Sequence, residues 1–234
     1  MRHMRDAFSG PLKGGGEFMG GLSDWQAQQR ARLLESIRRL DVPVAVANAV
    51  AAVPRQRFVP PALQDRAYDD NALPIEAGQT ISQPSLVALM IAEMQIQPGD
   101  RVLELGTGSG YEAAVLSWLA RKVITVERIA SLAERARNLL DGLRITNVEI
   151  HVASDDLGWP DGAPYDSIIV AAAAPRVPES LVKQLRIGGR MVIPVGNRSD
   201  QSLLIVVRTE EGYDTRNRMT VRFVPLISPD AFPN

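Results

Sequence analysis

The sequence predicts an α/β fold with a doubly wound, mostly parallel sheet, an antiparallel sheet edge and an N-terminal helical extension. Two observations support this prediction. From about residue 101 onward, short apolar segments typical of buried strands alternate with segments of helical periodicity. A glycine-rich loop at 106–110 directly follows the first of these strands, at the position where open α/β sheets bind their ligands.

The part of the chain before this alternation is expected to be helical and then irregular. Residues 1–22 are rich in glycine and are predicted to form a flexible tail. Ser23 precedes a helix whose apolar side chains recur at helical spacing, and a second helix is predicted at 43–52. The proline-rich segment 54–84 is predicted to be irregular. A connection of this length is more often a functional loop than an idle linker.

The remaining elements follow in regular order after a helix that begins at about residue 86. The last two predicted strands flank a polar turn that contains Gly212. The sheet is therefore expected to end in an antiparallel pair and to be Rossmann-like overall. The predicted strands are 101–105, 122–126, 148–152, 167–170, 190–195, 202–208 and 219–224, and the predicted helices are 110–119, 130–141 and 178–185, the last ended by Gly188-Gly189.

The composition narrows the possible functions. The length of 234 residues suits one large domain or one domain with a smaller appendage, and the net charge of -1 gives no global field that favours nucleic acid or an anionic membrane. No apolar run approaches the roughly 18 residues that span a bilayer, and the N-terminus lacks the apolar core of a secretory signal. We therefore expect a cytoplasmic protein without nucleic-acid or membrane partners, and we expect a monomer.

The chain has no cysteine, and its two histidines are His3 and His151. Thiol catalysis, disulfides and cysteine-ligated metals are therefore excluded, and a Ser-His-Asp triad would have to use one of these two histidines. We expect no bound metal. Proton chemistry would rest on carboxylates, hydroxyls or the substrate itself.

The loop Gly106-Thr107-Gly108-Ser109-Gly110 carries the first functional signal. Glycines between a strand and a helix let a ligand approach the main chain closely, although a tight turn alone would also explain them. Glu127 ends the next predicted strand, about 20 residues further on, where a carboxylate accepts hydrogen bonds from ribose hydroxyls. The loop and the spaced acid together indicate a nucleoside-containing cofactor.

The details of the loop favour S-adenosylmethionine over a dinucleotide. The dinucleotide pattern G-x-G-x-x-G needs its third glycine at the position of Tyr111, but here that glycine comes one residue earlier, at Gly110. Glu104, on the strand before the loop, disfavours a pyrophosphate and favours the sulfonium cation of S-adenosylmethionine.

Several segments together resemble the protein-L-isoaspartate O-methyltransferases, which are class I methyltransferases that use S-adenosylmethionine. Order and spacing match from about residue 30 to 226, and 78–84 is the most family-specific stretch. The matching stretches are Arg57-Phe58-Val59-Pro60, Leu73-Pro74-Ile75, Gly78-Gln79-Thr80-Ile81-Ser82-Gln83-Pro84, 102–111, Val126-Glu127-Arg128-Ile129, Leu157-Gly158-Trp159, Ile193-Pro194-Val195-Gly196 and Phe223-Val224-Pro225-Leu226.

The resemblance implies the division of the chain and the roles of the site residues. Residues 23–85 would form N-terminal helices and the active-site loop, as one compact unit with a cofactor-binding core at 86–234. Ser82 takes the family's active-site serine position, although a serine before Gln83-Pro84 is also a good helix N-cap. The implied loop residues are Gln79, Thr80 and Ile81, and the implied cofactor-binding residues are Glu104, Gly106, Thr107, Gly108, Ser109, Gly110, Glu127, Arg128, Ser154 and Asp155.

The implied substrates are proteins and peptides that contain isoaspartyl residues, and the second product is S-adenosylhomocysteine. The free carboxylate of isoaspartate has a pKa near ~3.5, so it is already an anion at neutral pH. Methyl transfer to it needs alignment and exclusion of water rather than a general base or a metal. The methyl ester then collapses to a succinimide, which can reopen to normal aspartate.

The chain departs from the family pattern at three places. Residues 153–156 lack the family's Gly-Asp-Gly motif, Glu112 stands where glutamine is common, and Glu76-Ala77 replaces a more glycine-like stretch. Two alternatives therefore stay open. One is a diverged methyltransferase that acts on a dedicated peptide or small carboxylate, and the other is a binding module that keeps the fold without catalysis.

Overall fold

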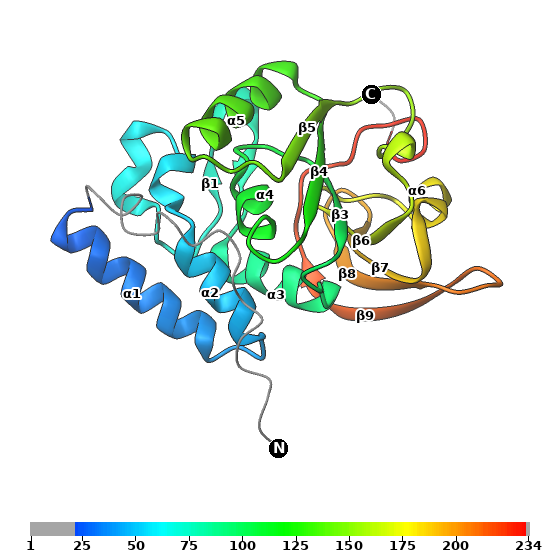
Figure 1. Cartoon of the computed structure of the whole chain (residues 1–234), viewed down its shortest axis with the longest axis horizontal. Helices are drawn as coiled ribbons and strands as arrows, with labels where there is room; N and C mark the ends of the chain where they lie inside the picture. The colour runs from blue at the N-terminus through cyan, green and yellow to red at the C-terminus, as the bar shows by residue number, and fades with distance from the viewer. Residues whose placement is uncertain (1–21, 233–234) are drawn as a thin grey trace.

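The computed structural model describes residues 22–232, so the predicted tail lies outside the described residues except for Leu22. A seven-stranded sheet with the order β5-β4-β3-β6-β7-β8-β9 forms the centre of the molecule (Figure 1). The strands from β5 to β7 are parallel, and β8 and β9 are antiparallel to their neighbours. The predicted fold class and its antiparallel edge are confirmed. The strands are β3 (Arg101–Leu105), β4 (Lys122–Glu127), β5 (Val148–Val152), β6 (Tyr165–Val170), β7 (Leu185–Gly196), β8 (Gln201–Arg208) and β9 (Tyr213–Val221).

Helices cover both faces of the sheet. One buried cluster packs the helices from α1 through α5 against one face of the sheet, and a second cluster packs α6 against the other face. β3 and β6 are parallel neighbours, and the order in which successive strands are added reverses between them. A crevice opens at such a switch point in open α/β sheets. The helices are α1 (Asp24–Arg38), α2 (Val44–Ala52), α3 (Pro84–Met94), α4 (Tyr111–Leu116), α5 (Ala130–Gly142) and α6 (Glu179–Gln184).

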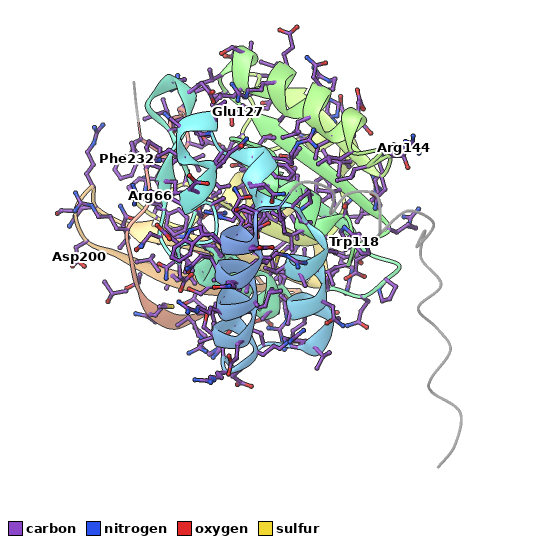
Figure 2. The ribbon with its side chains drawn as sticks, turned by 90° about the vertical axis from the view of Figure 1, so that its left-hand side faces the viewer. Arg66, Trp118, Glu127, Arg144, Asp200 and Phe232 are labelled. Carbon is purple, nitrogen blue, oxygen red and sulfur yellow. The ribbon has the colours of Figure 1, made fainter. Side chains whose placement is uncertain are left out.

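The first helix begins where the sequence predicts it. The hydroxyl of Ser23 accepts a hydrogen bond from the Gln26 N–H, and the Gln26 side chain accepts one from the Ser23 N–H, which completes a capping box. The buried face of α1 carries Leu33, Leu34 and Ile37, and it packs against α2 and α3. Figure 2 views the molecule from this side, with α1 in front.

The segment 54–84 is more ordered than predicted. It contains the short 3-10 helices η1 (Arg55–Phe58), η2 (Pro61–Arg66) and η3 (Glu76–Gly78) and an antiparallel pair, β1 (Leu73–Pro74) with β2 (Thr80–Ile81). Elements of this length leave no periodicity in a sequence. The prolines alone therefore determined the prediction that this segment is irregular.

The N-terminus of α3 shows that the N-cap interpretation of Ser82 is wrong. The cap position is Gln83, and its side chain makes no cap hydrogen bond. The carboxylate of Asp70 takes this role, because it accepts hydrogen bonds from the Ser85 N–H at 2.9 Å and from the Gln83 side chain at 3.1 Å. A distant acid thus caps the helix and leaves the Ser82 hydroxyl for another role.

Two predicted strand boundaries are also wrong. β7 begins at Leu185, directly after α6, and Gly188 and Gly189 lie inside it, next to an irregularity in its pairing with β6. A side chain at Gly189 would come within 3.0 Å of the Asp166 carbonyl oxygen, so the glycines allow a close approach of two strands. β9 spans 213–221 instead of the predicted 219–224. The prediction was wrong because β9 is an edge strand whose side chains before Val221 are exposed and therefore show no apolar alternation.

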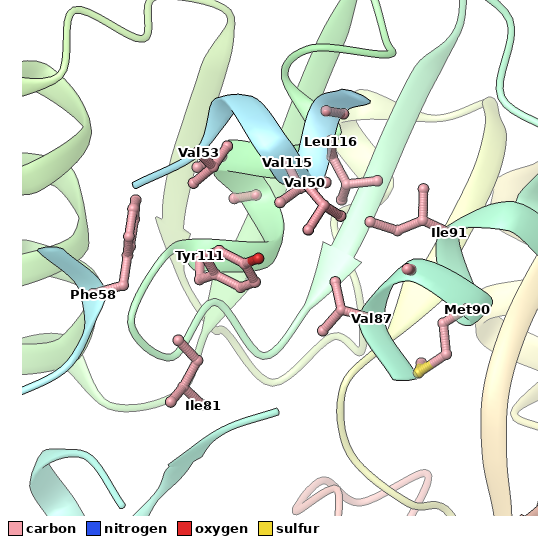
Figure 3. Close-up of a cluster of buried hydrophobic side chains, with 14 of the residues drawn as sticks. Val50, Val53, Phe58, Ile81, Val87, Met90, Ile91, Tyr111, Val115 and Leu116 are labelled. Carbon is pink, nitrogen blue, oxygen red and sulfur yellow. The ribbon is translucent and has the colours of Figure 1, made fainter. Parts of the chain in front are cut away.

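The larger buried cluster ties the N-terminal helices to the core (Figure 3). Val50 and Val53 from the end of α2 face Val115 from α4, while Phe58 lies beside Tyr111. Among the described residues, no helix combines the length and apolarity needed to cross a membrane.

We predict that Gly110 is required for packing. Its φ is +85°, and a Cβ added there would lie 3.2 Å from the Ala136 Cβ on α5, so Gly110→Ala should lower the free energy of unfolding by about 1–3 kcal/mol. Gly142→Ala is the matched control, because no atom lies within 4 Å of its added methyl group. Urea unfolding measures both, and equal midpoints for Gly110→Ala and the unmodified chain would contradict the prediction.

Candidate active site

A cavity of about 1320 Å³ opens at the carboxyl ends of β3 and β4. This volume exceeds the roughly 300–1,000 Å³ of a typical single-ligand pocket, so it accommodates a cofactor together with part of a second molecule. Five stretches contribute most of its wall: the loop and helix start at 78–87, the glycine loop at 105–112, the end of β4 with the turn at 126–129, the segment 153–158 after β5, and the C-terminal segment 219–229.

The cavity brings together nearly all the predicted site residues. Glu104 and Gly110 do not line its wall. Glu104 is fully buried behind the glycine loop, and Gly110 faces α5. The predicted residues that line the cavity are Gln79, Thr80, Ile81, Ser82, Gly106, Thr107, Gly108, Ser109, Glu127, Arg128, Ser154 and Asp155.

Glu127 closes the glycine loop from the neighbouring strand. One carboxylate oxygen accepts the Gly108 N–H at 2.9 Å, and the other accepts the Ile129 N–H at 2.9 Å. Each oxygen keeps a lone pair, so the same carboxylate can also accept two hydroxyl donors from a ligand. Gly106 and Gly108 have φ values of +95° and +52°, the left-handed region that favours glycine and turns the backbone around this carboxylate.

Two buried carboxyl groups lie beside the loop. Neither carboxyl oxygen of Glu104 has a hydrogen-bond partner among the described residues, and one oxygen of Glu112 also lacks one. Burial, and then the nearby Glu112, raise the pKa of Glu104 well above its usual range. Burial raises the pKa of Glu112 to about 8. Glu112 lines the cavity, and an unpaired acid at its wall fits a ligand with cationic groups, a requirement that the sulfonium and ammonium groups of S-adenosylmethionine meet.

The sequence did not single out Arg55, which fixes the end of the loop 79–82. Its side chain is 1% exposed. Nε donates to the Ala67 carbonyl at 2.8 Å, and Nη2 donates to the Ser82 carbonyl at 2.8 Å. The guanidinium also lies over the ring of Tyr111, 4.7 Å from the centroid, and the ring edge of Phe58 completes this packing. No pattern in the sequence distinguishes this buried arginine from its exposed neighbour Arg57.

The loop 79–82 presents Ser82 to the cavity. Its side chain is half-buried, lines the wall and makes no hydrogen bond with other described residues. On the opposite side, the stretch 153–156 lies at the cavity wall in exposed positions although it lacks the family's usual motif. His151 stacks on Trp159 at 3.7 Å and does not line the cavity.

The sequence also missed the C-terminal wall of the cavity. Residues 219–229 and Arg198 line it, and the wall includes the cationic side chain of Arg222. In the sequence, the stretch 223–226 shows only a match to the family pattern. The position of a residue along the chain does not show which part of the sheet edge the chain folds back over. Within residues 22–232, no group of three or more histidine, aspartate or glutamate side chains is placed to hold a metal.

The profile of one protein family matches residues 28–231 of this chain, and its description is protein-L-isoaspartate(D-aspartate) O-methyltransferase. The chain belongs to this family. A protein-L-isoaspartate O-methyltransferase of Pelotomaculum thermopropionicum is 50% identical over 188 residues, with 80% of this chain and 82% of the relative covered. One of Rhodopseudomonas palustris is 47% identical, with 88% and 86% covered.

Solved structures of the family have the same fold. One protein-L-isoaspartate O-methyltransferase superposes with a TM-score of 0.76 at 30% identity, over 83% of this chain and 65% of the other chain. A Plasmodium falciparum structure assigned to these enzymes, in complex with S-adenosyl-L-homocysteine, gives 0.72 at 25% identity over 83% and 96%. The chain is therefore a methyltransferase that uses S-adenosylmethionine.

We predict that Arg55 holds the active-site loop in register with the cofactor loop. Arg55→Lys keeps the charge but loses the planar fork, so the free energy of unfolding should fall by about 1–3 kcal/mol. The kcat of methyl transfer should fall roughly tenfold because Ser82 is displaced, while the KM for S-adenosylmethionine changes little.

Arg57→Lys, an exposed position on the same turn, is the control and should change neither quantity. Urea unfolding and steady-state kinetics measure the effects. A loss of stability without any change in kcat would show that Arg55 has only a structural role.

Proposed function

We propose that this protein transfers a methyl group from S-adenosylmethionine to the free carboxylate of isoaspartyl residues in other proteins, and so starts their repair. One observation carries the proposal: the loop 79–82 and the glycine loop line the same cavity. The loop is the most family-specific part of the sequence, whereas the glycine loop is shared by many methyltransferases. Their meeting in one cavity supports a site in which an isoaspartyl carboxylate faces the methyl donor.

The two sides of the cavity have different tasks. The glycine loop and Glu127 hold the nucleoside, since both present hydrogen-bonding groups to the cavity. The cofactor supplies an electrophilic methyl group on a sulfonium. Ser82 is the candidate that donates a hydrogen bond to the substrate carboxylate and aligns one of its oxygens with that methyl group. No proton has to be removed, because the attacking group is already an anion.

The size of the cavity supports a protein substrate. Its wall includes the exposed turn 153–156 and the C-terminal segment 219–229, so the cavity reaches the surface, and an extended backbone can enter it. Arg222 and Arg198 place positive charge on this wall, which favours an anionic substrate group. The expectations of a monomer, a cytoplasmic location and no nucleic-acid partner stay predictions.

The test is methyl transfer from labelled S-adenosylmethionine to two peptides that differ only in isoaspartate or aspartate at one position. Base-labile label on the isoaspartyl peptide alone is the expected result. Label on neither peptide, with cofactor binding intact, would favour the dedicated-substrate alternative. A series of flanking sequences around the isoaspartate separates broad repair from a dedicated target, because repair requires tolerance of many sequences.

We predict that Ser82→Ala lowers kcat/KM for the isoaspartyl peptide by about 10- to 100-fold through loss of one hydrogen bond to a charged group. The affinity for S-adenosylmethionine, measured by calorimetry, should stay unchanged. Ser85→Ala is the matched control, because Ser85 lines the same cavity but its hydroxyl already accepts a hydrogen bond from Gln83 at 2.8 Å. Equal rates for Ser82→Ala and Ser85→Ala would remove Ser82 from the proposed mechanism.

A further inference from the structure

Glu112 is an unusual group to find at the wall of a cofactor cavity. It lies in the first turn of α4, is 9% exposed, and lines the cavity beside the glycine loop. Its Oε1 is buried without a hydrogen-bond partner among the described residues. A buried carboxylate in this state would bear an uncompensated charge, so the group is held as a neutral acid until a cation arrives.

The titratable groups close to Glu112 are acidic. Glu104 on β3 and Tyr111 on α4 lie close to Glu112, and Glu127 on β4 lies close to Glu104. Arg55 lies over the Tyr111 ring and donates to the backbone carbonyls of Ala67 and Ser82. No ion pair involving Glu112 occurs within the part of the chain that the structure describes.

We propose that Glu112 senses the charge of the cofactor. It gives its proton to solvent when S-adenosylmethionine binds and keeps the proton when S-adenosylhomocysteine binds. Glu112 thereby makes the site prefer the methyl donor. The two ligands differ by one methyl group and by the positive charge on sulfur. A carboxylate formed beside the cavity attracts only the sulfonium, because the thioether of the product is neutral. Glu104 stays neutral behind the loop, since two close carboxyl groups resist ionising together.

The sensor has a consequence for the catalytic cycle. Methyl transfer turns the sulfonium into a thioether and forms a methyl ester on the substrate. The carboxylate of Glu112 then has no counter-charge and takes a proton back from solvent, so Glu112 releases no net proton over a turnover. The product loses an attraction that the substrate had, which favours its exchange for a new methyl donor. This inference rests on the cofactor and not on the isoaspartyl substrate.

Calorimetric titration of the full chain without peptide tests the proposal. Titrations at pH 7 in phosphate and in Tris, two buffers that differ in ionisation enthalpy, give the number of protons released per ligand. The wild type should release about half to one proton more with S-adenosylmethionine than Glu112→Gln does, and the two proteins should match with S-adenosylhomocysteine. Because the pKa of Glu112 is raised to about 8, the group is neutral at pH 7, and the extra release should shrink as the pH rises to 9.

The affinities provide a second readout. Glu112→Gln should weaken S-adenosylmethionine roughly fivefold to tenfold and S-adenosylhomocysteine less than about twofold. Glu134→Gln, an exposed acid on α5 away from the cavity, is the control and should change neither affinity. Equal losses for both ligands, which leave the ratio of the two affinities unchanged, would assign Glu112 a structural role and overturn the proposal.

The wild type alone keeps the proposal testable if Glu112→Gln does not fold. Equal proton release with both ligands across pH 7 to 9 would then overturn it. Because no peptide is present, failure here leaves the isoaspartyl assignment intact, and failure of the peptide assay leaves the charge sensor intact.

Discussion

The buried guanidinium of Arg55 is the constraint on which the arrangement of the site depends. A charge at this depth is costly unless its donors are used, and two of them bond to the carbonyls of Ala67 and Ser82. Its flat face covers Tyr111, which belongs to the helix after the glycine loop. One side chain therefore joins the start of the irregular segment, the active-site loop and the cofactor loop, and these parts are far apart in the sequence.

The same packing explains why a long segment with little regular structure can hold a site. The loop 79–82 is bounded by the two-residue strand β2 and by α3, whose N-terminus is capped by Asp70 instead of by a local side chain. Phe58 and Ile81 fill the space around Tyr111 (Figure 3). Hydrogen bonds to Arg55 and Asp70 supply the order that helix or strand pairing supplies elsewhere, so Ser82 is left facing the cavity with a free hydroxyl.

The sequence predicts the parts of the fold that depend on local periodicity. β3, β4 and β6 are buried on both faces, so their apolar runs are continuous and predict the strands directly. β9 was misplaced because an exposed edge strand has no apolar pattern to reveal it. The glycine loop and Glu127 were found by spacing, whereas Arg55 and the wall at 219–229 depend on contacts between distant segments. Such contacts have no signature in a single sequence.

The chemistry of the site follows from the few ionisable groups that the chain brings to it. Since His151 lies outside the cavity wall, carboxyl groups are the main acids near the cofactor loop, and burial decides which of them carry charge. Glu127 accepts two backbone N–H donors, whereas the buried carboxyl oxygens of Glu104 and Oε1 of Glu112 have no hydrogen-bond partner among the described residues, and burial raises the pKa of both acids. Burial without a partner thus keeps Glu104 and Glu112 neutral in the ligand-free site, and only a cation in the cavity makes a charge on Glu112 favourable.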